Sequence, residues 1–106
     1  MQAKMAAVSA DALTLVAEPR RREILRLVWD RERSAGEIAE RLPVTFGAVS
    51  QHLALLREAG IVSVRREGRR RLYRADRRAL GELAPALEAM WAASLDRLAR
   101  AAEDVP

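Results

Sequence analysis

The chain has 106 residues, half of them hydrophobic and about a third charged. This length fits one domain and excludes a multidomain enzyme. Nineteen basic residues, all but one of them arginine, outnumber fifteen acidic residues and leave a net charge of +4, which favours nucleic acid as a partner. Because the chain contains no cysteine, disulfides, thiolate metal sites and thiol redox chemistry are excluded.

The sequence offers no membrane-spanning segment. Its longest run without aspartate, glutamate, lysine or arginine, 42–56, contains Gln51 and His52 and is shorter than the ~18 apolar residues that a spanning helix needs. Asp11 interrupts the only stretch that resembles the apolar core of a signal peptide, residues 1–17. We therefore expect a cytoplasmic protein.

Apolar residues at helical spacing predict two helices in the first thirty residues. The first helix is defined by Val8, Ala12, Leu15 and Val16. Pro19 ends this helix or begins the next, because proline is tolerated in a first helical turn. The second helix presents a core-facing stripe of Ile24, Leu27 and Val28.

A shorter helix is predicted from its capping residues. Ser34 and Glu37 have the spacing of a capping box, in which each side chain bonds the backbone of the other residue. Ile38 and Leu42 would face inward, and Pro43 would close the helix.

Thr45 is the predicted N-cap of the following helix, which has inward residues Val49, Leu53 and Leu56. Gly60 would end it as a left-handed residue after the last turn. Residues 34–59 thus form two helices joined by a turn of about three residues, which is a helix-turn-helix arrangement.

Beyond Gly60 the apolar period changes from 3.6 to 2. Alternation at Val62 and Val64, a turn at Glu67 and Gly68, and a returning run up to Ala75 predict a hairpin. Eight arginines and only two acids lie in 65–78. A charge run is usually a solvated face. A basic hairpin directly after the second helix, however, is what a winged-helix DNA reader requires.

The C-terminal region is expected to be helical. Asp76 would cap a helix through Leu83, and Pro85 would break or restart it. A long apolar stripe follows at steps of three and four: Leu87, Trp91, Leu95, Leu98, Ala102 and Val105. Because a small core cannot cover this stripe, we expect it to pair with a second copy and with the first helix. The candidate dimerisation residues are Val8, Ala12, Leu15, Leu87, Trp91, Leu95, Leu98 and Ala102.

The second helix of the motif is expected to enter the major groove with its N-terminal half. Its candidate DNA-binding residues are Thr45, Phe46, Gly47, Ala48, Ser50, Gln51 and His52, and those of the wing are Arg65, Arg66, Arg69, Arg70 and Arg71. Gln51 can pair with adenine, and Phe46 can pack on a thymine methyl group. Gly47 disfavours helix by ~1 kcal/mol relative to alanine and is either tolerated in the first turn or needed for close approach to DNA.

Four segments together strongly resemble the ArsR family of bacterial winged-helix repressors: PRRREIL (19–25), GEIA (36–39), AVSQHLALLREAGIV (48–62) and REGRRRLY (66–73). The resemblance implies a mainly α fold with a small β-hairpin, and a homodimer that binds a near-palindromic operator in double-stranded DNA. It implies a single domain, 1–106, with a DNA-binding core and wing at 19–78 and dimerisation helices at 5–18 and 79–106.

The same resemblance places this chain in a metal-free branch of the family. The family's metal-binding cysteine pair aligns with Ser34 and Gly36, and its second site needs histidine on the C-terminal helices, whereas the only histidine is His52. We expect no metal and no cofactor. A lone histidine is more often structural or a phosphate contact than a metal ligand. A small-molecule effector remains unidentified by the sequence.

Other function classes make different predictions. An enzyme needs a nucleophile with its base, paired carboxylates or a phosphate loop, and none has recognisable spacing here. A winged-helix module that binds proteins would have a neutral or acidic wing. A sequence-indifferent DNA-binding protein would share the charge, and its binding would not survive excess random competitor DNA.

Overall fold

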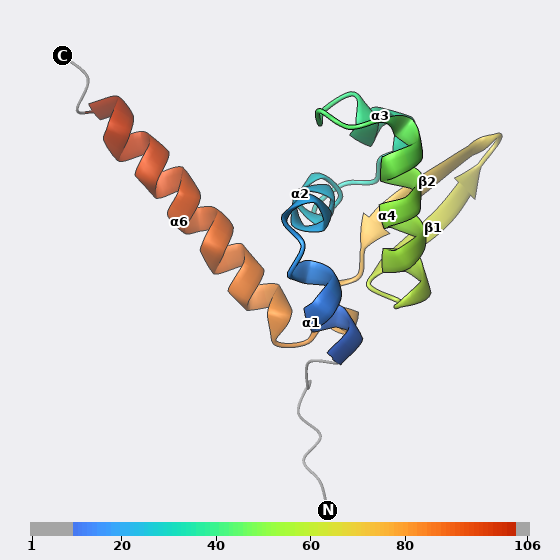
Figure 1. Ribbon diagram of the computed structural model, residues 1–106, viewed down its shortest axis with the longest axis horizontal. Helices are drawn as coiled ribbons and strands as arrows, with labels where there is room; N and C mark the ends of the chain where they lie inside the picture. The colour runs from blue at the N-terminus through green and yellow to red at the C-terminus, as the bar shows by residue number, and fades with distance from the viewer. Residues whose placement is uncertain (1–9, 104–106) are drawn as a thin grey trace, which may run out of the picture.

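The computed structural model describes residues 10–103, and these form six helices and one two-stranded sheet (Figure 1). The elements are α1 (Ala10–Val16), α2 (Pro19–Leu27), α3 (Ala35–Ala39), α4 (Phe46–Glu58), β1 (Val62–Glu67), β2 (Arg70–Ala75), α5 (Arg77–Leu80) and α6 (Leu83–Glu103). This is the predicted mainly α fold with a β-hairpin, in the order of a winged helix-turn-helix. Val8, a predicted dimerisation residue, and Val105 lie outside the described residues.

One hydrophobic core joins the helices to the base of the hairpin. Its fully buried side chains are Ile24, Leu25, Val28, Ile38, Val49, Leu53, Leu56, Ile61, Val62 and Leu80. They include the whole predicted stripe of α4 and, from the stripes predicted for α2 and α3, Ile24, Val28 and Ile38, whereas Leu27 and Leu42 are half-buried against the core. Burial of these side chains is the main stabilising contribution, because each removes apolar surface from water.

The predicted helix caps are present. The Ser34 hydroxyl accepts from the backbone N–H of Glu37 at 3.2 Å, and the Glu37 carboxylate accepts from the backbone N–H of Ser34 at 2.8 Å. The Thr45 hydroxyl accepts from the N–H of Ala48 at 3.1 Å. A further cap was not predicted: the carboxylate of Glu18, the residue before the first residue of α2, accepts from the N–H groups of Arg20 and Arg21.

The connection between α3 and α4 is longer than predicted. α3 ends at Ala39, four residues before Pro43, and Leu42 packs half-buried against the core from a turn rather than from the helix. The prediction that Pro43 closes the helix was therefore wrong, because the chain leaves helical hydrogen bonding earlier.

The hairpin forms with Val62 opposite Ala75 and Glu67 opposite Arg70. Its turn is Gly68 and Arg69, one residue later than predicted, and Gly68 takes the positive φ of 63° that the tight reversal requires. Arg33 extends the sheet through an isolated β-bridge to Tyr73 of β2. The backbones of the two residues exchange hydrogen bonds of 3.1 and 2.8 Å. The wing is thus joined by backbone bonds to the segment before α3.

The predicted helix from Asp76 through Leu83 was wrong in its end point. Asp76 caps α5 as expected, but α5 ends at Leu80, because Gly81 has a φ of 56° and turns the chain. Pro85 causes no break, since it lies in the first turn of α6, where proline is tolerated. α6 then runs away from the body of the protein, as Figure 1 shows.

Candidate nucleic-acid interface

α4 has a buried face and an outward face. Val49, Leu53 and Leu56 are buried in the core, which turns the N-terminal side chains of the helix outward. Phe46 is 60% exposed although it is a large apolar residue, and Gln51 is exposed as well. A single exposed apolar residue is common on a protein surface, and its position on the leading half of α4 makes Phe46 available for contact with a partner.

Gly47 is exposed, and no side chain or backbone of the described residues crowds it. A Cβ built at this position would meet only the Thr45 hydroxyl, at 3.9 Å, which is ordinary contact. Packing within the protein therefore does not require glycine here. Thr45 is also exposed, and Ala48 and Ser50 are half-buried on the same half of the helix.

His52 points to the protein rather than away from it. It is half-buried, and its Nδ1 lies 3.5 Å from a guanidinium nitrogen of Arg21 on α2. Arg21 in turn donates to the carbonyl oxygen of Leu15 at 2.7 Å. This placement favours a structural role for His52 over contact with a DNA base.

The arginines of the wing have different surroundings, although all five are exposed. Arg65 donates two hydrogen bonds, of 2.9 and 2.7 Å, to the carboxylate of Glu32. This contact lowers the pKa of Glu32 and raises that of Arg65. Arg70 pairs with Glu37 on α3 at 3.1 Å. Two of the five wing arginines are thus bound to acids of the protein.

The other three wing arginines, Arg66, Arg69 and Arg71, have no ion pair within residues 10–103. Arg66 and Arg71 lie directly opposite each other in the hairpin, an arrangement of like charges that is destabilising. These two arginines line one hollow together with Val64 of β1 and Arg57 of α4. The hollow combines three guanidinium groups with no acid, which suits a phosphate.

Arg57 was not among the predicted site residues. It also borders a larger hollow between α4, the start of α3 and the wing, which Phe46, Ser50 and Arg69 to Arg71 help to line. One signal in the sequence could have identified Arg57, because it lies eleven residues after Phe46, three helical turns along the same face. Without the hairpin register, however, its approach to Arg66 and Arg71 was not apparent.

The predicted dimerisation residues separate into buried and exposed ones. Ala12 and Leu87 are buried in the core of this chain, so they are not available to a second copy. Leu15 and Trp91 are half-buried against that core. Leu95 and Leu98 are about two-thirds exposed, and Ala102 is exposed too. Leu13 and Met90 are further exposed apolar residues, which the sequence analysis did not single out.

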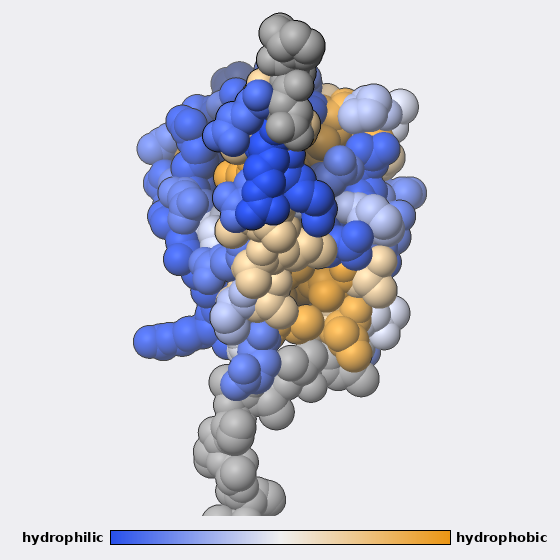
Figure 2. All heavy atoms as spheres, turned by 90° about the vertical axis from the view of Figure 1, so that its left-hand side faces the viewer, coloured by the Kyte–Doolittle hydropathy of each residue, from blue (hydrophilic) through white to orange (hydrophobic). Residues whose placement is uncertain are grey.

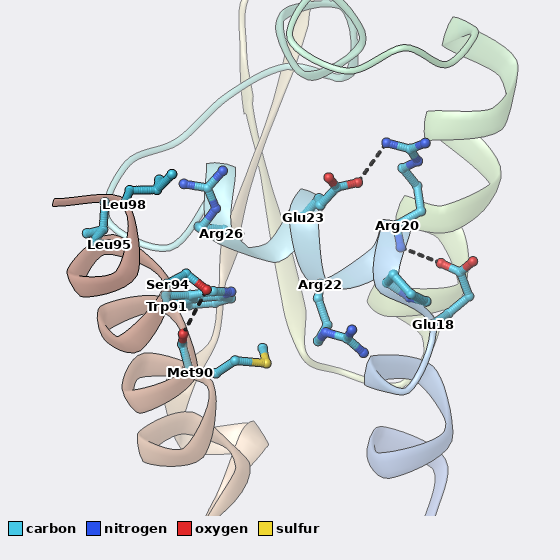
Figure 3. Close-up of a pocket in the computed structure, with 11 residues that line it drawn as sticks. Glu18, Arg20, Arg22, Glu23, Arg26, Met90, Trp91, Ser94, Leu95 and Leu98 are labelled. Carbon is cyan, nitrogen blue, oxygen red and sulfur yellow. Dashed lines mark hydrogen bonds and ion pairs between the residues drawn. The ribbon is translucent and has the colours of Figure 1, made fainter. Parts of the chain in front are cut away.

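The exposed apolar side chains of α6 border a groove between α6 and α2. Figure 3 shows Met90 and Trp91 extending from α6 toward Arg22, with Leu98 near Arg26. Figure 2 looks onto this side of the molecule and shows hydrophobic side chains gathered beside α6 within a hydrophilic surround.

Residues 10–103 contain no group of three or more histidine, aspartate and glutamate side chains placed to hold a metal ion. None of their helices has the length and apolar character needed to cross a membrane.

Comparison with known proteins relates this arrangement to a family. The family model of the bacterial regulatory proteins of the arsR family matches residues 18–64. The transcriptional activator HlyU of Vibrio cholerae is 40% identical over 70 residues, which cover 66% of this chain and 65% of the activator, slightly less than two thirds of its length. The biofilm growth-associated repressor of Agrobacterium fabrum is 35% identical over 95 residues, which cover 90% of this chain and 81% of the repressor.

A solved structure resembles most of this arrangement. It is the solution structure of a homodimeric winged helix-turn-helix DNA-binding domain from Mycobacterium bovis, described as a possible ArsR-family transcriptional regulator. Its TM-score is 0.63 at 32% sequence identity, and the match covers 82% of this chain and 77% of that one.

Proposed function

This chain belongs to the arsR family of bacterial regulatory proteins, and from this membership we propose that it represses transcription by binding a near-palindromic operator as a homodimer. It is a transcriptional regulator and not an enzyme. Residues 19–78 would bind DNA, and 5–18 together with 79–106 would form the dimer. The observation that carries the proposal is the group of unpaired arginines beside the outward face of α4.

The proposed contacts divide by chemistry. Phe46 and Gln51 would touch base edges, because they are exposed on the leading half of α4. Arg57, Arg66 and Arg71 would hold backbone phosphates, since their guanidinium groups form no ion pair with an acid among residues 10–103. Base contacts select the sequence, whereas phosphate contacts fix the position of the protein on it.

We propose further that DNA binding needs no metal effector. Zinc, nickel and copper regulatory sites use thiolate or imidazole ligands, and this chain has no cysteine and a single histidine. His52 is already in contact with Arg21. Operator affinity should therefore be unchanged by a chelator and by low micromolar zinc, measured by fluorescence anisotropy of labelled DNA. Release by stoichiometric zinc that requires His52 would contradict the metal-free proposal.

The central test is binding to the DNA upstream of the protein's own gene, in the presence of excess random duplex. A regulator should retain a shifted complex on the upstream fragment and yield a footprint with two half-sites. Equal competition by random DNA would instead indicate a sequence-indifferent DNA-binding protein. Repression is tested by transcription from that promoter in vitro, in which added protein should lower the transcript level.

A further inference from the structure

α6 is held to the rest of the protein only near its start. Ala84 and Leu87 are buried, Trp91 is half-buried, and every later described residue except the half-buried Ser94 is exposed. The direction in which α6 leaves the body therefore depends on the contacts of its first turns, as Figure 1 illustrates.

Among these contacts is a cluster of four side chains, which we call the tryptophan joint: Trp29, Arg77, Glu88 and Trp91. The indole N–H of the buried Trp29 donates to the Glu88 carboxylate at 2.9 Å. The ring of Trp91 meets that of Trp29 edge to face, with centroids 4.9 Å apart and planes at 83°. Arg77 lies over the Trp29 ring at 5.4 Å and is 3.7 Å from the Glu88 carboxylate.

The tryptophan joint also reaches the end of α2. The guanidinium group of Arg77 donates to the carboxylate of Asp30 at 2.6 Å and to the carbonyl oxygen of Trp29 at 3.3 Å. The cluster thus connects the segment after α2 with α5 and α6. It lies beside the groove of Figure 3, in which Trp91 is the residue of α6 that the two features share.

These contacts are directional. A charge-assisted hydrogen bond and an edge-to-face ring pair each favour one geometry, whereas aliphatic packing such as that of Leu87 tolerates small rotations. Without the Glu88 carboxylate, the N–H of a buried indole would lose its acceptor. The chemistry of the cluster is therefore suited to holding α6 at one angle to the body that carries α4.

We propose that the tryptophan joint sets the spacing of the two reading helices on DNA, with its four members as positioning residues. This inference rests on the proposed function, in which α6 forms the dimer. When α6 is shared with a second copy, its angle to each body fixes the separation and rotation of the two α4 helices. One base pair inserted between half-sites moves them apart by about 3.4 Å and rotates them by about 35°.

The test uses a duplex that the wild-type protein selects from a random-sequence library, together with versions having one base pair added or removed at its centre. The variant is Arg77→Gln. Arg78→Gln is the matched control, because Arg78 is the next residue of α5 and has the same charge. Its side chain is exposed and has no partner among the described residues. Wild type and control should bind the duplexes of altered spacing at least about tenfold more weakly than the selected duplex. For Arg77→Gln the same difference in affinity should be less than about threefold.

Tryptophan emission gives an independent readout, because the only two tryptophans of the chain are both in the joint. Arg77→Gln should shift the emission while light scattering shows an unchanged dimer, and Arg78→Gln should shift neither. Glu88→Gln is the second test variant, to be used if Arg77→Gln does not fold. It keeps an acceptor for Trp29 and removes the charge facing Arg77, so the same loss of spacing discrimination is expected.

The outcomes separate the two proposals. A folded, dimeric variant with wild-type spacing discrimination, or with an equal loss of affinity on every spacing, would overturn the role of the joint and leave the proposed function intact. Wild-type protein that selects no sequence, or binds all spacings equally, would overturn both.

Discussion

The arginines of the wing are equivalent in the sequence and different in the structure. Arg65 and Arg70 hold the hairpin to Glu32 and Glu37, while Arg66 and Arg71 face each other and share a hollow with Arg57. A like-charged pair directly across a hairpin destabilises the protein on its own. An anion between the two groups would remove that penalty, which is why their chemistry points to phosphate.

Substituting these arginines should have distinct effects on the salt dependence of DNA binding. Arg66→Ala or Arg71→Ala should reduce the slope of log affinity against log salt by about 0.9 per phosphate contact on each subunit. Arg65→Ala should leave that slope nearly unchanged, since its guanidinium group is bound to Glu32. Anisotropy titrations at several salt concentrations measure both. Equal slope changes for Arg65→Ala and Arg66→Ala would contradict the division.

Substitutions on α4 should alter selectivity instead. Gln51→Ala and Phe46→Ala should each reduce the difference between specific and random DNA by about 1–3 kcal/mol, because they would remove the proposed base contacts. Both side chains are exposed, so the fold should be unaffected. Competition assays with the two DNAs provide the comparison. If either variant weakened both complexes equally, that side chain would not be reading bases.

At the scale of elements, the capping box of α3 makes stability depend on pH. The pKa of Glu37 is lowered, chiefly because the backbone N–H of Ser34 donates to its carboxylate and also because Arg70 is near. A lowered pKa in the folded state means that ionised Glu37 stabilises the fold above the pKa of the unfolded chain. That contribution is lost as pH falls through the lower, folded-state value.

We therefore expect the free energy of unfolding to decline more steeply with falling pH in wild type than in Glu37→Gln, below about pH 4.5. Glutamine keeps an acceptor at the same position of the capping box but cannot titrate. Urea unfolding at a series of pH values measures the difference between the two proteins. A difference that does not vary with pH would show that the capping carboxylate is not the cause.

Elements defined by local chemistry were predictable from the sequence. The Ser34 and Thr45 caps, the left-handed Gly60 and the hairpin all follow from the residues within a few positions. The end of α5 was missed because Gly81 is compatible with either a helix or a turn until tertiary packing selects one. Glu18 was missed as a cap because glutamate is not among the preferred N-cap residues.

The candidate site was predictable only in part. α4 and the wing follow from the motif, whereas the grouping of Arg57 with Arg66 and Arg71 depends on the strand register and on how α4 packs against β1. The acids that pair with Arg65 and Arg70 lie 33 residues away in the sequence. Separations of that length are not visible in local patterns.

At the scale of the whole molecule, the exposed stripe on α6 predicts the oligomeric state. Leu95→Arg should give a monomer, because it places a charge on a surface that we expect a second copy to cover. Leu95 is 67% exposed within one chain, so circular dichroism should show an intact fold. Light scattering at micromolar concentration gives the mass. A monomeric wild-type protein, or a dimeric variant, would contradict this assignment.

The unsupported outer part of α6 also links folding to protein concentration. The residues beyond Trp91 make few contacts with the body, and an isolated helical segment of that length is marginal in water. In a dilute solution this segment would fray, and association would restore it, so its helicity would rise with the amount of protein present. If α6 forms the dimer as proposed, a cell holding few copies would contain chains in which the end of α6 is not helical. Occupancy of the operator would then rise more steeply with protein concentration than it would for a protein that is always dimeric.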